Sequence, residues 1–121
     1  MEVGSFLNPQ PEFRIIPFWF WNGTLEESEI IRQIKEMAEK GLGGFCISPR
    51  PGLRIPHLSK AWFDRIKLAL KTASSCGLKV WLHDEYLYPG TMGGGQVNLG
   101  HPHYRAQFLT FRETIVQGGQ Q

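Results

Sequence analysis

The sequence predicts an α/β fold with the element order β-α-β-α-β and parallel strands. Three short apolar segments rich in aromatic or β-branched residues alternate with two segments that carry apolar residues at helical spacing. A glycine follows each helical segment, where it can adopt the left-handed conformation of a C-terminal cap. Strands separated by single helices and short turns imply parallel neighbours and right-handed crossovers.

The composition fits one soluble globular domain or a piece of a larger one. The 121 residues include 13 basic and 11 acidic side chains, and the net charge is +2. No run of Lys or Arg is longer than a dipeptide, so neither nucleic acid nor a membrane surface is an expected partner. The longest apolar runs stop before the roughly 18 residues of a bilayer span. The N-terminus lacks a signal-peptide pattern, which predicts a cytoplasmic location, although a truncated start would leave the same pattern.

The N-terminal part is expected to contain a lead-in, a strand and a helix. Residues 1–13 are polar and aperiodic and form the lead-in. The segment RIIPFWFWNG (14–23) ends in an Asn-Gly turn pair and predicts a buried strand. Thr24 and Glu27 match a capping box for a helix that starts directly after Thr24, and Gly41 ends that helix.

The second half of the pattern repeats the first. The segment GGFCIS (43–48) predicts a strand that runs into a proline-broken turn, and Ser59 is placed to cap a second helix, which a glycine ends. The segment LKVWLHDEY (78–86) predicts a third strand, followed by a loop rich in glycine. Farther on, FLTFRETIV (108–116) alternates weakly and is a candidate fourth strand. The two cysteines, Cys46 and Cys76, lie far apart in the sequence and are interpreted as buried thiols.

Alternation sorts the side chains of the three expected strands into two sets, because successive residues point to opposite faces. The uniformly apolar set, expected to face the helices, is Phe18, Phe20, Phe45, Ile47, Val80 and Leu82. The other set is Trp19, Trp21, Cys46, Ser48, Arg50, Trp81, His83 and Glu85. This second set becomes more polar toward the C-terminal end of each strand. An open, doubly wound sheet would bury Arg50 and Glu85 beneath helices.

The polar gradient suits the inside of a (β/α)8 TIM barrel, whose C-terminal rim carries the chemistry. A barrel takes about 250 residues, so this chain holds roughly three of eight strands. Residues 14–97 are expected to form the N-terminal portion of a barrel catalytic domain, and residues 98–121 a linker and the start of a β-rich insert. An unclosed sheet exposes aromatic residues and an unpaired edge, which favours self-association through that face.

Five segments resemble, in this order, the opening of the catalytic barrel of bacterial glycoside hydrolases in the α-L-rhamnosidase group, family one hundred and six. They are PFWFWNG, EIIRQIKEM, GLGGFCISPRPGL, PHLSKAWF and VWLHDEYLYPGTMGGG, within about residues 14–97. The resemblance implies a carbohydrate partner and hydrolysis of O-glycosidic bonds, with this chain supplying the substrate-binding wall. The principal catalytic carboxylates of such barrels come from later strands. A non-catalytic carbohydrate-binding or assembly module derived from such a barrel is the alternative.

Asp84 and Glu85 are the candidate catalytic residues. Glycoside hydrolysis uses two carboxyl groups about 5–5.5 Å apart for retention or about 6.5–9.5 Å apart for inversion. As neighbours on a strand the two point to opposite faces, and the alternation places Glu85 toward the cleft. Arg50 on the adjacent strand would favour ionised Glu85, which argues against a general acid and favours binding of sugar hydroxyls or a cation such as calcium. We expect no turnover by the isolated chain.

Five residues near the strand ends are candidates for substrate binding: Trp21, Asn22, Arg50, His83 and Tyr86. Trp21 lies nearest the expected rim and offers a flat apolar platform for the C–H face of a sugar ring. His83 can donate a hydrogen bond to a hydroxyl, act as an acid or bind a metal, and a buried histidine with a structural role is the alternative.

No metal site is predicted. His101 and His103 form an H-P-H triplet like that of metal-dependent amidohydrolases. In those enzymes the pair follows the first strand, where Asn22 stands in this chain.

Overall fold

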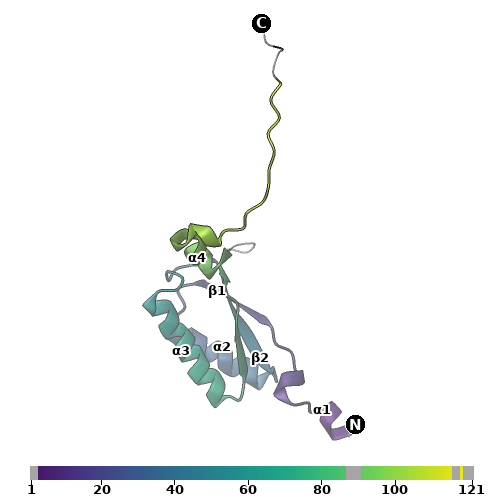
Figure 1. Cartoon of the computed structure of the whole chain (residues 1–121). Coiled ribbons are helices and arrows are strands. Elements are labelled where there is room, and N and C mark those ends of the chain that lie inside the picture. Colours follow the sequence, from purple (N-terminus) through teal and green to yellow (C-terminus); the bar gives the residue numbers. More distant parts are fainter. Residues whose placement is uncertain (1–2, 87–90, 116–117, 119–121) are drawn as a thin grey trace.

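A three-stranded parallel sheet carries the fold, in a computed structural model that describes residues 3–86, 91–115 and 118. The strands are β1 (Phe18–Gly23), β2 (Gly44–Leu53) and β3 (Lys79–Leu82), in the order β1-β2-β3. Helices α2 (Glu27–Glu39) and α3 (Lys60–Ser75) connect them and cover one face (Figure 1). The predicted α/β fold with parallel strands and alternating helices is confirmed.

Shorter elements precede and follow this unit. They are α1 (Val3–Leu7), a 3-10 turn η1 (Pro11–Phe13), β4 (Glu85–Tyr86), β5 (Thr91–Met92), η2 (Gly93–Gly95), α4 (Gln96–Gly100) and η3 (Pro102–Tyr104). Strands β4 and β5 pair in antiparallel fashion as a separate sheet. Residues 105–115 have no regular secondary structure and lead away from the sheet as an extended segment (Figure 1). The fourth strand expected over 108–116 is therefore wrong for 108–115, and residue 116 lies outside the described residues.

The hydrophobic core fills the space between the sheet and the two helices. Its buried members are Trp21, Ile30, Ile34, Phe45, Ile47, Trp62, Ile66, Ala69, Ala73 and Leu78. The apolar stripes predicted for both helices are on this side, because burying them removes the largest apolar area from water. Among the described residues, no helix has both the length and the apolar character needed to cross a bilayer.

The two tryptophans of β1 face the helices, contrary to the sequence expectation. In the parallel register Trp19 lies beside Ile47 and Trp21 beside Pro49. Laterally paired residues of a sheet point to the same side, so both indoles share the helix-facing side with Ile47. Trp21 is 1% exposed and makes an edge contact with Trp62 of α3, with ring centroids 6.5 Å apart.

Phe18 and Phe20 consequently lie on the opposite face, where they are 57% and 54% exposed. The predicted facing of β1 is thus wrong by one residue. Every position from Phe18 to Trp21 is aromatic, so alternation in this segment contains no polar residue to mark the outer face. The larger indole rings occupy the space under the helices, where they bury more area.

The second predicted helix start is confirmed and the first is wrong. In α3 the backbone N–H of Trp62 donates to Ser59 Oγ at 3.2 Å, as expected for an N-cap. Helix α2 begins only at Glu27, because Leu25 has a left-handed φ of 54°. Its N-cap is Glu26, which makes no side-chain capping bond. Glu27 instead accepts a hydrogen bond from Arg65 Nη1 at 2.6 Å.

The second and third strands also differ in extent from the prediction. Strand β2 continues through the prolines that were expected to form a turn over 48–52, and it ends at Leu53. The predicted strand 78–86 divides, because β3 ends at Leu82 and β4 pairs in the other sheet. Cys46 and Cys76 are free thiols and only partly buried. Desolvation still raises the pKa of the Cys46 thiol.

Candidate functional site

Three polar side chains meet on the open face of the sheet, at the C-terminal end of β3 and beside the middle of β2. Ser48 Oγ lies 3.2 Å from His83 Nδ1, and His83 Nε2 lies 3.9 Å from Glu85 Oε2. The backbone N–H of His83 donates to Ile47 O at 2.9 Å, which continues the β2–β3 pairing past Leu82. We call Ser48, His83 and Glu85 the His83 cluster.

The cluster runs from a buried end to an accessible end. Ser48 is completely buried, whereas the side chains of His83 and Glu85 are 24% and 28% exposed. The ring of Phe18 meets the imidazole edge to face, with centroids 5.6 Å apart and planes at 88°. A ligand can therefore reach the imidazole and the carboxylate, while the serine supports them from within.

Arg50 extends this polar face along β2. It stands two residues after Ser48, so the alternation of the strand places both on the same side. Its guanidinium carbon lies 4.5 Å from the centroid of the Phe20 ring, a cation–π contact. Arg50 and His83 thus lie on the open face, as the sequence predicted.

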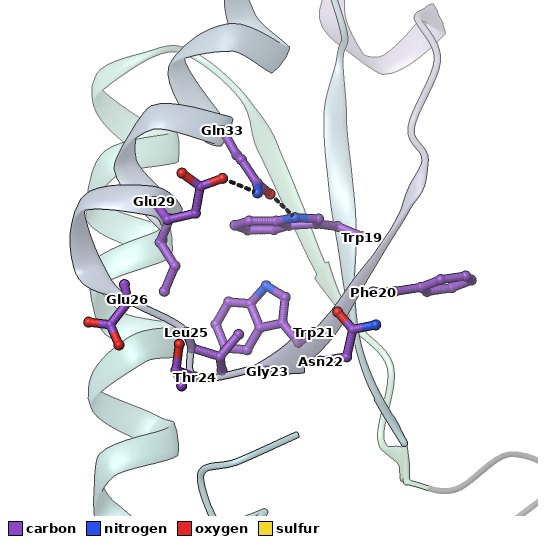
Figure 2. Close-up of a pocket in the computed structure, with 11 residues that line it drawn as sticks. Trp19, Phe20, Trp21, Asn22, Gly23, Thr24, Leu25, Glu26, Glu29 and Gln33 are labelled. Atoms are coloured by element: carbon purple, nitrogen blue, oxygen red, sulfur yellow. Dashed lines mark hydrogen bonds between the residues drawn. The ribbon is translucent and has the colours of Figure 1, made fainter. Parts of the chain in front are cut away.

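Trp21 does not join them. Its ring lies between β1 and α2, where Figure 2 shows it beneath Trp19, with Phe20 pointing to the other side of the strand. Trp19 Nε1 donates to Gln33 Oε1 at 2.7 Å. The expected sugar platform at Trp21 is corrected to a core side chain, for the same reason that the facing of β1 is wrong.

A cavity of about 250 Å³ lies on this helix side of β1. Trp19, Trp21, Leu25, Glu29 and Gln33 are among its lining residues (Figure 2). Asn22, a predicted binding residue, also lines it and is exposed at the end of β1. The structure therefore separates Trp21 from the His83 cluster, whereas the Asn22 side chain points to the same side of β1 as Phe20 (Figure 2).

Tyr86 belongs to an aromatic layer above α3. Its ring stacks on His57 at 4.8 Å with an interplanar angle of 25°, and His57 meets Trp62 at 4.9 Å. Burial in this layer lowers the pKa of His57, which favours the neutral imidazole. Gly94 packs closely against the same pair, since a Cβ there would lie 3.2 Å from His57 Nδ1. Tyr86 thus holds the loop after β2 against η2.

Asp84 and Glu85 have different surroundings, as their adjacent positions predicted. Asp84 is exposed, and its backbone carbonyl accepts a hydrogen bond from Gly93 N at 3.1 Å. Asp84 therefore braces the start of the glycine run through its backbone. Glu85 alone contributes a carboxylate to the His83 cluster.

Ser48 and Phe18 are functional candidates that the sequence analysis did not select. Ile47 pairs with Leu82, so Ser48 and His83 follow the same rung of the ladder and become neighbours. The pair depends on the register of β2 against β3, which the sequence alone does not establish. Phe18 could not be found either, because its facing depended on the ambiguous aromatic run.

No metal-binding constellation stands out in the described part of the chain. Within residues 3–86, 91–115 and 118, no group of three or more His, Cys, Asp or Glu side chains could hold an ion. The rings of His101 and His103 contact each other at 5.6 Å in the exposed segment around η3.

The arrangement is suited to binding a polar, uncharged group at the end of the sheet. The imidazole can donate, the Glu85 carboxylate can accept, and Arg50 supplies a fixed positive charge on the same face. Two exposed phenylalanines beside these groups offer apolar contact area. No protein-family model matches the chain, and no curated protein matches its sequence.

Proposed function

We propose that this chain forms the first three strands of a (β/α)8 glycoside hydrolase and supplies its substrate-binding wall. The carrying observation is the His83 cluster on the helix-free face of the sheet, at the C-terminal end of β3, with Arg50 farther along β2 toward the C-terminal end of that strand. In (β/α)8 enzymes this end of the barrel holds the active site. The resemblance of residues 14–97 to rhamnosidase-type barrels names the reaction class.

The one-sided covering of the sheet supports a barrel. Helices α2 and α3 both pack on the face that holds Trp21 and Phe45. A doubly wound sheet would need helices on the other face as well. That face instead carries Phe18, Phe20 and Trp81, the last of which is 45% exposed. Such a face suits the interior of a barrel that further strands complete.

The same exposed rings suit a carbohydrate. Sugar rings present apolar C–H faces to aromatic side chains and hydroxyl groups to polar ones. Phe18 and Phe20 flank Ser48 and His83 on the open face, and this replaces the platform expected from Trp21. Glu85 has the role of holding hydroxyls, and the catalytic pair of carboxyl groups requires residues from later strands.

A non-catalytic carbohydrate-binding or assembly module is the second candidate. The observation that favours it is the size of the exposed aromatic side chains on the open face. Exposed apolar patches of this kind mark interaction surfaces. It differs from the first candidate in needing no contribution from later strands.

Titration by NMR tests the binding function in the chain itself. We expect methyl α-L-rhamnopyranoside to shift the amide signals of His83, Glu85 and Trp81. Glu85→Gln should weaken this binding, because the amide replaces an ionised acceptor, whereas Glu39→Gln on the exposed end of α2 should leave it unchanged. Shifts confined to the cavity under β1, or no shifts with any methyl glycoside, would exclude the proposed wall.

Turnover separates the two candidates. The isolated chain should not hydrolyse aryl rhamnosides, since it supplies one side of the site. In a complete barrel containing these residues, Glu85→Gln should strongly raise KM for an aryl rhamnoside. A complete barrel that binds the sugar without hydrolysing any aryl glycoside would favour the binding module.

A further inference from the structure

We infer that Ser48 is a positioning residue that fixes the His83 imidazole, so that His83 Nε2–H and Glu85 together bind one hydroxyl group of a neutral sugar. The identity of the ligand rests on the proposed function. The position of the ring rests on the contacts of the His83 cluster alone.

The protonation pattern of the ring follows from its two neighbours. A neutral imidazole has one nitrogen that donates and one that accepts. The ionised Glu85 carboxylate can only accept, so Nε2, the nitrogen that faces it, is the favoured donor. Nδ1 is then the acceptor, and the Ser48 hydroxyl at 3.2 Å donates to it. Glu85 thereby selects the tautomer with its proton on Nε2, and the Ser48 hydroxyl holds the ring in that orientation by donating to Nδ1.

Ser48 is well placed for this task because it is completely buried. Bulk water does not reach the Ser48 hydroxyl. Breaking its hydrogen bond to His83 would therefore leave a buried polar group without a partner, which is energetically unfavourable. The backbone bond from His83 N to Ile47 O and the edge contact with Phe18 restrict the ring further. Backbone, serine and phenylalanine thus hold the imidazole from three sides.

The gap between His83 and Glu85 is the binding position. At 3.9 Å, Nε2 and Oε2 are too far apart for a direct hydrogen bond, which ends at about 3.2 Å. A hydroxyl oxygen about 2.8 Å from both atoms spans this gap with an angle of roughly 90° at the oxygen. It accepts from Nε2–H and donates its own proton to the carboxylate. A hydroxyl is both donor and acceptor, whereas an anion would meet the Glu85 charge and a cation the Nε2 proton.

Nitrogen-15 NMR of the imidazole tests the position of the ring in the wild-type chain. We expect the neutral His83 ring to show the proton on Nε2, and His83→Gln identifies its signals. Ser48→Ala should move the Nδ1 resonance toward that of an acceptor without a hydrogen-bond donor, and Ser48→Thr, which keeps the hydroxyl, should restore the wild-type resonance. Ser74→Ala on the exposed side of α3 is the matched control. A proton on Nδ1 in the wild-type chain overturns the inference without any variant.

Binding of methyl α-L-rhamnopyranoside tests the consequence. Ser48→Ala should raise its dissociation constant by about 2- to 12-fold, the worth of one net hydrogen bond, and Ser74→Ala should not. An altered Nδ1 resonance with unaltered affinity would overturn the hydroxyl site. If the wild-type ring has the expected tautomer and no sugar binds, the positioning role of Ser48 is supported and the proposed carbohydrate function fails.

Discussion

Two adjacent aromatic side chains of β1 show how strongly the environment differs between the faces of the sheet. Trp21 contacts Trp19 and Trp62 within the core, whereas Phe20 lies on the open face with Arg50 against its ring. Removing a buried indole leaves a cavity in addition to the lost transfer free energy. Removing a half-exposed ring lowers stability less, because only the buried part of its surface loses contacts.

We therefore expect Trp21→Ala to lower the free energy of unfolding by about 3–5 kcal/mol. Phe20→Ala should lower it by less than about 1 kcal/mol, because half of the ring already faces water. Urea unfolding followed by circular dichroism measures both. The reverse order of the two costs would restore the facing that alternation predicted and contradict the observed register.

The two helices differ in how their N-termini are held. Ser59 accepts a hydrogen bond from Trp62 N, whereas α2 starts from Glu26 without a side-chain cap. Thr24 lies before the left-handed Leu25 and outside the first turn of α2. Sequence similarity to a capping box therefore does not establish a cap when the preceding backbone turns away.

Matched substitutions distinguish the two positions. Ser59→Ala should cost about 1 kcal/mol of stability, the usual worth of a lost N-cap, and Ser59→Asp should retain most of it. Thr24→Ala should change stability by no more than about 0.5 kcal/mol. Thermal unfolding of the three variants decides, and equal losses at both positions would show that Thr24 does cap α2.

The buried face of an element can be predicted from sequence only where polar residues alternate with apolar ones. In α3, charged residues separate Trp62, Ile66 and Ala69, so the buried stripe was predictable. In β1 the aromatic run from Phe18 to Trp21 offers no such contrast, and the packing volume under the helices decides the facing. The Ser48–His83 contact depends on the register of β2 against β3, which is a tertiary property.

In the molecule as a whole, helices cover one face of the sheet and leave the other open. The core lies entirely on the helix side, while Phe18, Phe20 and the half-exposed Trp81 lie on the open face without comparable cover. The exposed aromatic area provides a hydrophobic driving force for association that the small net charge of +2 opposes only weakly.

We expect the isolated chain to form oligomers whose mass rises with concentration above the 13.8 kDa of one chain. Phe18→Ser combined with Phe20→Ser should return it to the monomer mass, because both rings lie on the open face. Leu99→Ser, at an exposed position of α4, is the control. Size-exclusion chromatography with light scattering gives the masses, and oligomers that persist in the double variant would place the contact elsewhere.

The parallel order of β1, β2 and β3 also has an evolutionary consequence. All three strands deliver the chain to the same edge of the sheet, where the segments after β1 and β2 contact the core through the partly buried Leu25 and Ile55. Insertions or substitutions at the exposed positions of these segments can diversify ligand preference while the core stays intact. Proteins descended from this unit can thus acquire new ligand specificities with little loss of folding stability.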